Sequence, residues 1–448
     1  MEETKISKKF FISSLVILAV MHLGFLFYAV RHEAFLTKDS HEYLQQAENL
    51  KEGYGWYSGD LNDPHQPHLE SRRPPLYAFF ISLTDVLFKN IVFILITQNL
   101  LSLLNFATLF YLLLHFKFDQ KIIGLLFLPL LFFPSQFIFS NMIMAEILFQ
   151  TTIFWAFFFM IFFLLRGNFM LLVLHSIFLS LAILTKPVLY LFWLPEIFWF
   201  VFLFFRKKVA IPQVSISLIP LLTVIILSLY NEKKTGYFHY SSMKETNLMS
   251  YNAYQTLRLN YTAEEAKNIL DSVHTQSISE SSNFKQQSEN FQRSAVEIIK
   301  NNLSGYLFLQ LKGMINFFID VGRHDMFLFF YEDFQESETG ISYYYDKDGI
   351  QGVLNYLKQF NPLLIFYSTL ILFINIIMLL ALLFFIFNKN VSPEIRLFTI
   401  LLIFYIAFVT GLIGSARFRV PVYPQLLFTV PFFMEYIKNS HFYRKLKW

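Results

Sequence analysis

The sequence predicts an all-α polytopic membrane protein. Of its 448 residues, 55% are hydrophobic and only 15% are charged, so a single soluble core could not absorb the apolar excess. The apolar residues fall in long runs separated by short basic loops, a pattern typical of membrane helices. The chain has no cysteine, which excludes a disulfide framework, a thiol nucleophile and a cysteine zinc site.

The apolar runs predict about ten membrane-spanning helices, because about 20 residues are needed to cross the hydrocarbon. The first, Phe10 to Val30, has no small-residue cleavage pattern behind it and is interpreted as an uncleaved helix. The other runs are 91–114, 121–139, 146–165, 168–185, 187–205, 210–230, 361–387, 396–414 and 421–437. A shorter run, Pro75 to Phe88, begins at a proline pair and is predicted to lie at the membrane interface.

The charges of the loops predict the orientation. With about ten spans both termini are cytoplasmic, and the cytoplasmic loops and basic tail collect the excess of lysine and arginine. The far side then holds a long first loop, 31–90, a larger segment, 231–360, and short turns near 140–145, Lys186 and 415–420. The net charge of +4 gathers into no nucleic-acid footprint, and no Gly-rich phosphate loop supports ATP or dinucleotide chemistry.

These assignments divide the chain into three parts. Residues 1–230 form a transmembrane core with the first loop, 231–360 a helical extracytoplasmic cap, and 361–448 the last transmembrane helices with a basic cytoplasmic tail. Within the cap, the apolar run from Leu303 to Phe330 contains several ionisable residues. It is therefore predicted to be an interfacial or partly buried helix. If it spanned the membrane, the topology after it would invert.

Two carboxylates on the far side are candidate site residues. Asp39 begins a helix-like stretch soon after the first span, and Glu146 stands at the outer end of a later span. Each has a structural alternative. Asp39 would cap its helix, with Glu42 at capping-box spacing, and Glu146 would be stabilised by the helix macrodipole. Against these alternatives, an ionisable residue near the bilayer is a functional candidate.

Two arginines, Arg417 and Arg419, lie in the predicted turn between the last two spans, against the charge bias of the other loops. A guanidinium suits bidentate recognition of phosphate, so an anion at the membrane surface is the expected partner. Contact with lipid headgroups is the structural alternative.

Together these segments resemble the GT-C superfamily, specifically the relatives of the dolichyl-phosphate-mannose protein mannosyltransferases and of the bacterial lipid A aminoarabinose transferase. The resemblance covers 1–230 and, more loosely, 361–437, whereas 231–360 matches nothing. The segments that carry it are Asp39-Ser40-x-x-Tyr43, Ala47-x-x-Leu50-x-x-Gly53-Tyr54-Gly55, Arg73-Pro74-Pro75-Leu76-Tyr77, Glu146 and Arg417-Phe418-Arg419-Val420-Pro421. Two positions depart from the relatives: Lys186 stands where many have Arg, and Glu146 where the protein mannosyltransferases have Asp.

The resemblance implies a glycosyltransferase of the cell envelope that takes a sugar from a polyprenyl-phosphate donor, with inversion. The acceptor would be a glycolipid, a glycan or a protein, and the site would face the periplasm from a bacterial cytoplasmic membrane. Such a reaction needs a base and cations for the leaving phosphate. Asp39 is the expected base. Arg417 and Arg419, with Arg73 or Lys186, would hold the phosphate. Glu146 would position the acceptor or, with Asp39, ligate a divalent metal.

Other interpretations of the sequence remain open. Asp60, Asp63, His65 and His68 lie close together in the first loop and could bind zinc, although their spacing fits no standard pattern. A transporter or flippase would place ionisable residues at mid-span, where the chain has chiefly Glu196 and His175. A polymerase or ligase of lipid-linked oligosaccharides would place its functional residues in a large late loop. A non-catalytic scaffold would leave the placement of the charged residues unexplained.

Overall fold

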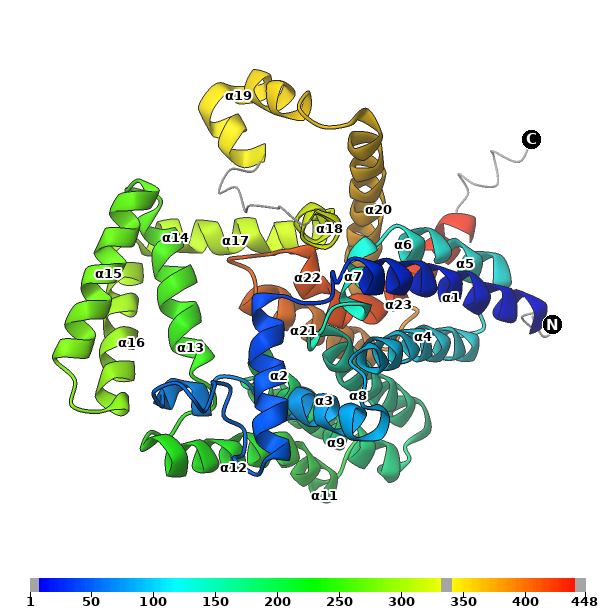
Figure 1. The fold of residues 1–448 in the computed structure, drawn as a ribbon. Coiled ribbons are helices and arrows are strands. Elements are labelled where there is room, and N and C mark those ends of the chain that lie inside the picture. Colours follow the sequence, from blue (N-terminus) through cyan, green and yellow to red (C-terminus); the bar gives the residue numbers. More distant parts are fainter. Residues whose placement is uncertain (1–7, 332–340, 440–448) are drawn as a thin grey trace.

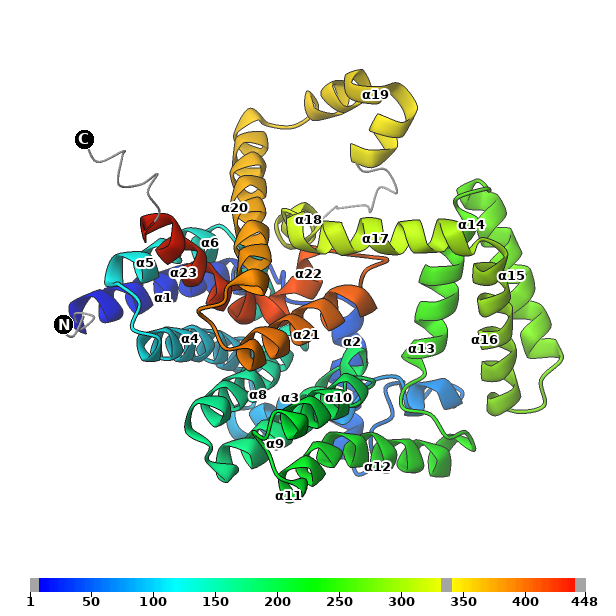
Figure 2. The same cartoon turned by 180° about the vertical axis from the view of Figure 1, so that it is seen from behind.

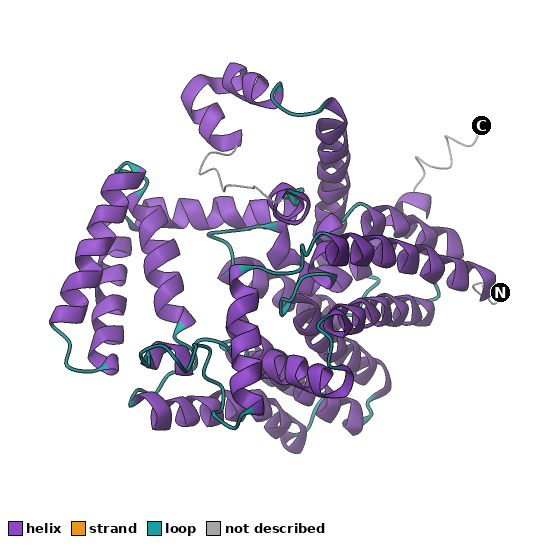
Figure 3. Ribbon diagram, in the orientation of Figure 1, coloured by secondary structure: helices purple, strands orange, loops and turns teal. Residues whose placement is uncertain are grey.

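The all-α membrane fold is confirmed. The computed structural model describes residues 8–331 and 341–439, and within these ranges the regular elements are helices, with no strand (Figure 3). All the predicted apolar runs are helical. The basic tail, with Arg444, Lys445 and Lys447, lies outside the described residues.

The first half of the chain forms helices α1 to α12 and three short 3-10 turns, η1 to η3. Their bounds are α1 Lys8–Arg31, α2 Lys38–Lys51, η1 Pro67–Glu70, α3 Pro75–Phe88, α4 Val92–His115, α5 Gln120–Leu125, α6 Phe127–Leu131, α7 Pro134–Ser140, α8 Glu146–Arg166, α9 Phe169–Thr185, η2 Pro187–Leu189, α10 Trp193–Phe205, α11 Ile211–Val214, η3 Ser215–Ser217 and α12 Leu218–Thr235.

The second half forms α13 to α23, with a π-helical turn, η4, and a 3-10 turn, η5. Their bounds are α13 Met243–Thr246, η4 Asn247–Ala253, α14 Tyr254–Leu257, α15 Ala263–Ser279, α16 Phe284–Asn301, α17 Leu303–Ile319, α18 Arg323–Phe330, α19 Ile341–Leu357, α20 Pro362–Phe387, α21 Pro393–Val409, α22 Ala416–Arg419, η5 Val420–Val422 and α23 Tyr423–Asn439.

Five helices of the described chain are long and apolar enough to cross a membrane. They are Phe10–Arg31, Val92–His115, Glu146–Arg166, Ile211–Thr235 and Pro362–Phe387. The shorter apolar helices are Pro75–Phe88, Phe169–Thr185, Trp193–Phe205 and Leu303–Ile319. The number of membrane-spanning helices, about ten, therefore stays a prediction.

The predicted span at 121–139 is broken in the structure. The pair Gln120–Leu131 and Pro134–Ser140 is bent by 66° at the break. Pro134 opens the second piece, where its missing N–H removes no helical hydrogen bond, whereas in the middle of one continuous helix it would remove one. The bend places α7 beside the outer turn that leads to Glu146.

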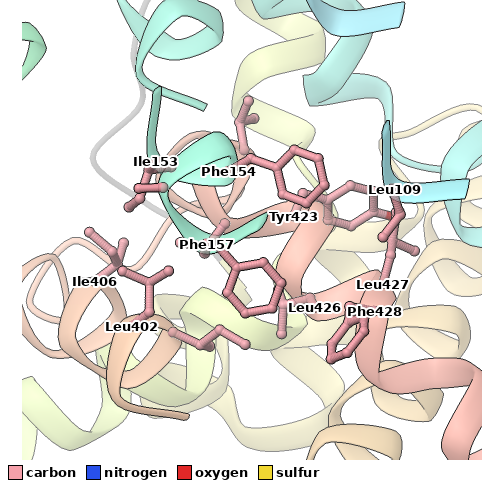
Figure 4. Packing of buried hydrophobic residues seen from close by; sticks show 14 of the residues in the cluster. Leu109, Ile153, Phe154, Phe157, Leu402, Ile406, Tyr423, Leu426, Leu427 and Phe428 are labelled. Atoms are coloured by element: carbon pink, nitrogen blue, oxygen red, sulfur yellow. The ribbon is translucent and has the colours of Figure 1, made fainter. Parts of the chain in front are cut away.

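Helix α8 is the most buried of the membrane-length helices, with 72% of its apolar window inside the protein, against 17% for α1. Its aromatic side chains pack against α4, α21 and α23 (Figure 4). Residues in this cluster include Leu109, Ile153, Phe154, Phe157, Leu402, Ile406, Tyr423, Leu426, Leu427 and Phe428. The outer end of α8 is therefore fixed on a close-packed core.

Buried amides join the helices around that outer end. Gln150 of α8 accepts hydrogen bonds from Gln136 of α7 at 3.0 Å and from Asn105 of α4 at 3.1 Å. It also donates to the carbonyl of Val420 at 2.5 Å. Because a buried amide is costly to leave unpaired, this network fixes the position of the segment that follows Arg419.

The cap stands beside the transmembrane core. Figure 1 shows α13 to α16 gathered at one side of the molecule, with α17 running back from them to α18, and Figure 2 shows the same arrangement from behind. The predicted helix from Leu303 to Phe330 is in fact two helices. The chain breaks at Asp320–Gly322, where Gly322 has a φ of 75°, a left-handed conformation that favours glycine.

Helix α17 is packed directly on the backbone that precedes α22. A Cβ added at Gly313 would lie 1.4 Å from the carbonyl oxygen of Gly411, so only glycine allows this approach. Asn316 donates to the carbonyl of Gly414 at 2.7 Å, and Gln310 donates to the carbonyl of Phe408. We refer to this contact between α17 and residues 408–414 as the α17 clamp.

Candidate active site

Asp39 lies in the first turn of α2, but it does not cap the helix. Thr37 is the N-cap: its hydroxyl accepts from the backbone N–H of Ser40 at 3.2 Å, and its own N–H donates to the Ser40 hydroxyl at 2.9 Å. The structural alternative in which Asp39 caps the helix, with Glu42 as capping-box partner, is therefore wrong. The carboxylate of Asp39 has other contacts.

Both oxygens of Asp39 accept hydrogen bonds from arginines. Arg73 donates to Oδ1 at 2.7 Å and Arg417 to Oδ2 at 2.9 Å, while the Asp39 side chain stays 32% exposed. Burial opposes ionisation, but the two guanidinium groups outweigh it and hold the pKa of Asp39 well below its usual range. Asp39 is therefore an accessible carboxylate that is ionised at neutral pH.

Glu146 is the first residue of α8 and is fully buried. Its Oε1 accepts from Lys186 at 2.6 Å and from Arg417 at 2.5 Å, whereas its Oε2 has no hydrogen-bond partner among the described residues. Its place in the first turn agrees with macrodipole stabilisation. The two cations show, however, that its carboxylate also belongs to a larger charged arrangement.

Arg417 connects the two carboxylates. Its Nε reaches Glu146 and its Nη2 reaches Asp39, so one planar guanidinium joins α2 to α8. The side chain is 29% exposed, and the rings of Phe139 and Phe418 lie within 6 Å of its guanidinium carbon. Figure 1 shows the three elements that meet here, α2, α8 and α22, far apart in sequence and adjacent in space.

Two further residues, Glu42 and Arg72, join the arrangement and were missed in the sequence. Glu42 accepts from Arg73 at 2.7 Å and from Arg72 at 2.9 Å. The signal was present: Asp39 and Glu42 are three residues apart on one face of α2, and a tandem arginine pair follows in the same loop. Arg73 is only 7% exposed, lies over the ring of Tyr43 and orients both acids.

These contacts form one set of linked ion pairs, which we call the charged cluster. It contains three carboxylates and four cations. Its members are Asp39, Glu42, Glu146, Arg72, Arg73, Lys186 and Arg417. The cluster thus carries one excess positive charge, and parts of Asp39 and Arg417 are open to solvent. It can bind an anion and present a carboxylate beside it.

Arg419, the second arginine of the predicted pair, lies elsewhere. It is 2% exposed and donates to the carbonyls of Phe317, Phe318 and Asp320 at the end of α17. Its guanidinium carbon lies 4.8 Å from the ring of Phe133. No contact joins Arg419 to the charged cluster within the described chain.

The loop residues considered as zinc ligands do not assemble into a site. Asp60 accepts from the backbone and side chain of Asn62, and His65 lies 3.1 Å from Glu70. The described ranges contain no group of three His, Cys, Asp or Glu side chains that could hold a metal ion. Asp39 and Glu146, the other pair considered for a metal, are joined by Arg417 instead.

Comparisons with known proteins find a likeness among solved structures. No family model matches the sequence, and no curated protein matches it. Among solved structures, the chain is similar to ArnT from Cupriavidus metallidurans in the apo state, with 12% identity and a TM-score of 0.38, over 90% of this chain and 76% of that chain. At this TM-score the likeness is loose, and the site itself has to support any functional conclusion.

Proposed function

We propose that this membrane protein is a glycosyltransferase that transfers a sugar from a polyprenyl-phosphate donor to an acceptor outside the cytoplasm. One observation supports this most: the charged cluster joins a solvent-accessible carboxylate to cations that exceed the carboxylates by one charge. A sugar linked to a lipid through one phosphate is a phosphodiester with a single negative charge. That charge complements the excess of the cluster.

The donor phosphate binds at Arg417 and Lys186 in this proposal. Both are bonded to Glu146, and each has further N–H donors beyond the bonds to carboxylates. Glu146 is fully buried, so it acts as a positioning residue that aims the two cations. As the sugar–phosphate bond breaks, the phosphate gains a second negative charge, which the same cations stabilise.

Asp39 acts as the base only after a change of partners. With two arginines on its carboxylate, its low pKa makes it a weak proton acceptor. A phosphate that attracts Arg417 takes away one of these arginines and leaves Arg73. Loss of one cation raises the pKa of Asp39, so binding of the donor prepares the base.

The reaction is then a direct displacement. The acceptor hydroxyl attacks the anomeric carbon, a new C–O bond forms, and its proton passes to Asp39. The bond between the anomeric carbon and the phosphate oxygen breaks, and polyprenyl phosphate leaves with the bonding electron pair. Arg73, held by Glu42, keeps Asp39 oriented during transfer. Inversion at the anomeric carbon follows from the resemblance to GT-C enzymes.

Arg419 has a different role from the one that its motif suggested. Because its guanidinium is bonded to the last carbonyls of α17, we propose that it fixes α22 and thereby the neighbouring Arg417, without touching the donor. A site facing the outside of a bacterial cytoplasmic membrane remains part of the proposal, since the loop charges favour that orientation.

The test is donor selectivity with purified protein in lipid nanodiscs. We expect release of polyprenyl phosphate and sugar transfer with at least one member of a panel of polyprenyl-phosphate sugars. The matched panel linked through a diphosphate carries an additional negative charge and should react poorly. Transfer from the diphosphate-linked panel alone would favour a polymerase or ligase of lipid-linked oligosaccharides. Turnover with neither panel would contradict the proposal.

A further inference from the structure

A second set of polar residues, 241–246 of the cap, lies against the first loop. Residues 241–246 run along the first loop: Ser241 donates to the carbonyl of Arg72 at 2.8 Å, and the N–H of Ser242 donates to the carbonyl of Ser71 at 3.2 Å. The side chain of Arg72 also reaches the hydroxyl of Thr246 at 3.5 Å. The segment that contains Glu245 is therefore bonded to the first loop at Ser71 and Arg72.

The carboxyl group of Glu245 has an unused oxygen. The residue is 7% exposed, Gln292 donates to its Oε1 at 3.0 Å, and its Oε2 is buried without a partner in the described chain. Gln292 is occupied at both ends, since it accepts from Lys244 and donates to the hydroxyl of Tyr237. A buried acceptor without a donor is unfavourable, so a ligand that supplied the missing donor would be favoured.

The pKa of Glu245 is consistent with binding of a ligand that donates a hydrogen bond. Burial raises its pKa to about 7, against the opposing effects of Lys244 and of the hydrogen bonds, including the one from Gln292. Near neutral pH a large fraction of the group is thus ionised, and its free oxygen can accept a hydrogen bond from a ligand.

Two segments connect Glu245 with the charged cluster: the one that follows Lys186 and the first loop. The charge of Glu245 also acts on Tyr190, which lies four residues after Lys186 and stacks on Tyr240 with ring centroids 5.4 Å apart. On the other side, the bonded series runs from Glu245's neighbour Thr246 through Arg72 to the acids of α2. Glu245 is thus linked both to the first loop, which carries Arg72 and Arg73, and to the segment that follows Lys186.

The residues around Glu245 indicate which chemical group could bind to its free oxygen. The charge of the adjacent Lys244 already acts on Glu245, which disfavours a further cation there. The remaining neighbours, Tyr190, Tyr237 and Gln292, carry neutral hydroxyl and amide groups. A neutral group that donates one hydrogen bond and packs against aromatic rings fits best, and a sugar hydroxyl has this chemistry.

We propose that Glu245 binds a hydroxyl group of the acceptor and is a specificity-determining residue, at a subsite between the first loop and the cap. This inference rests on the proposed function, because it takes the ligand to be the acceptor of sugar transfer. A donor sugar also carries hydroxyl groups, so the experiment separates the two sources.

The first measurement is equilibrium binding, without donor, of methyl glucoside, methyl galactoside and methyl mannoside to the full chain in nanodiscs. We expect at least one to bind with a millimolar Kd, and Glu245→Gln to raise that Kd about 10-fold, or ~1.4 kcal/mol. Glu245→Asp, which keeps the carboxylate, should give an intermediate value. Glu264→Gln, an exposed acid of the same cap, is the matched control and should leave the Kd unchanged.

Binding by none of the glycosides, or equal binding by wild type and Glu245→Gln, would overturn the subsite. Because this measurement involves no transfer, it can succeed even if the chain proves not to be a glycosyltransferase. With an active donor, Glu245→Gln should raise the KM for the acceptor and leave the donor KM unchanged. A rise in the donor KM alone would assign Glu245 to the donor sugar and overturn the acceptor assignment.

Discussion

The charged cluster and the pair His175–Glu196 are two regions where ionisable side chains meet among apolar helices, and they differ in three ways. His175 and Glu196 are both 0% exposed, lie 3.2 Å apart and form a single pair of one acid and one imidazole, and His175 also bonds the carbonyl of Ala156. The cluster shares each carboxylate between two cations, carries an excess charge and reaches solvent at Asp39. Burial alone therefore does not single out the candidate site; shared partners, excess charge and access to solvent distinguish it.

The largest expected effect in this comparison is that of Asp39→Asn. The amide cannot accept the proton, so sugar transfer should fall about 100-fold or more. Thr37 keeps α2 capped, but loss of the ion pairs to Arg73 and Arg417 should lower the melting temperature, so transfer is compared in the folded protein. Transfer and thermal unfolding of the variant are the measurements, with Asp63→Asn in the same loop as control. Full activity of Asp39→Asn would remove the base on which the proposed mechanism depends.

Arg417→Lys tests the phosphate side of the cluster with a smaller expected loss. Lysine keeps the charge but cannot join Asp39 and Glu146 through one planar fork, so donor affinity should fall about 10-fold. The measurement is the donor Kd. Arg419→Lys is the matched comparison: because three carbonyls lose a donor, it should lower the melting temperature, and in the folded protein it should weaken donor binding less than Arg417→Lys does. Equal losses of donor affinity would place both arginines at the donor.

Glu196→Gln tests the other side of the comparison, and we expect almost no effect on transfer. The amide is nearly the same size as the carboxyl group and can still hydrogen-bond His175, so the contact between the two helices is kept. Transfer should stay within about twofold of wild type, far from the loss expected at a catalytic carboxylate. A large loss of transfer, in a protein of normal stability, would show that the intramembrane pair takes part in function.

Single cysteines at positions 60 and 280 should change activity least and report only topology. The chain has no cysteine of its own, so labelling by an impermeant reagent is unambiguous. Both positions should react from the outside of the membrane. Labelling of either from the cytoplasm would contradict the orientation in which the charged cluster and the cap share one side.

Much of the fold could be predicted, because the pattern of apolar residues is set by the membrane itself. Helix α3 has the predicted bounds, Pro75–Phe88, and begins at its proline pair. The breaks at Phe133 and at Asp320–Gly322 were not predicted, although Pro134 and Gly322 were visible signals. How many helices cross the membrane depends on lengths and tilts that packing decides, and periodicity does not give these.

The candidate site was only partly predictable. Asp39 and Glu146 were chosen for their position relative to the spans, and the structure joins both of them through Arg417. Arg419 was placed beside Arg417 in the site, but side chains two residues apart on a helix such as α22 point in different directions. Glu42 was interpreted as part of a cap because a short-range pattern was preferred over a contact across the loop.

The α17 clamp has a consequence for engineering chimeric proteins. An exchange of the cap between related chains would naturally be cut near residues 231 and 360, where the polar segment begins and ends. Because Gly313 packs directly against Gly411, α17 forms one packed unit with the C-terminal helices. A graft whose α17 lacked a glycine at position 313 would place a side chain against that backbone and displace the turn before Arg417. The safer junction is at Asn302, the N-cap of α17, so that an interchangeable module ends there.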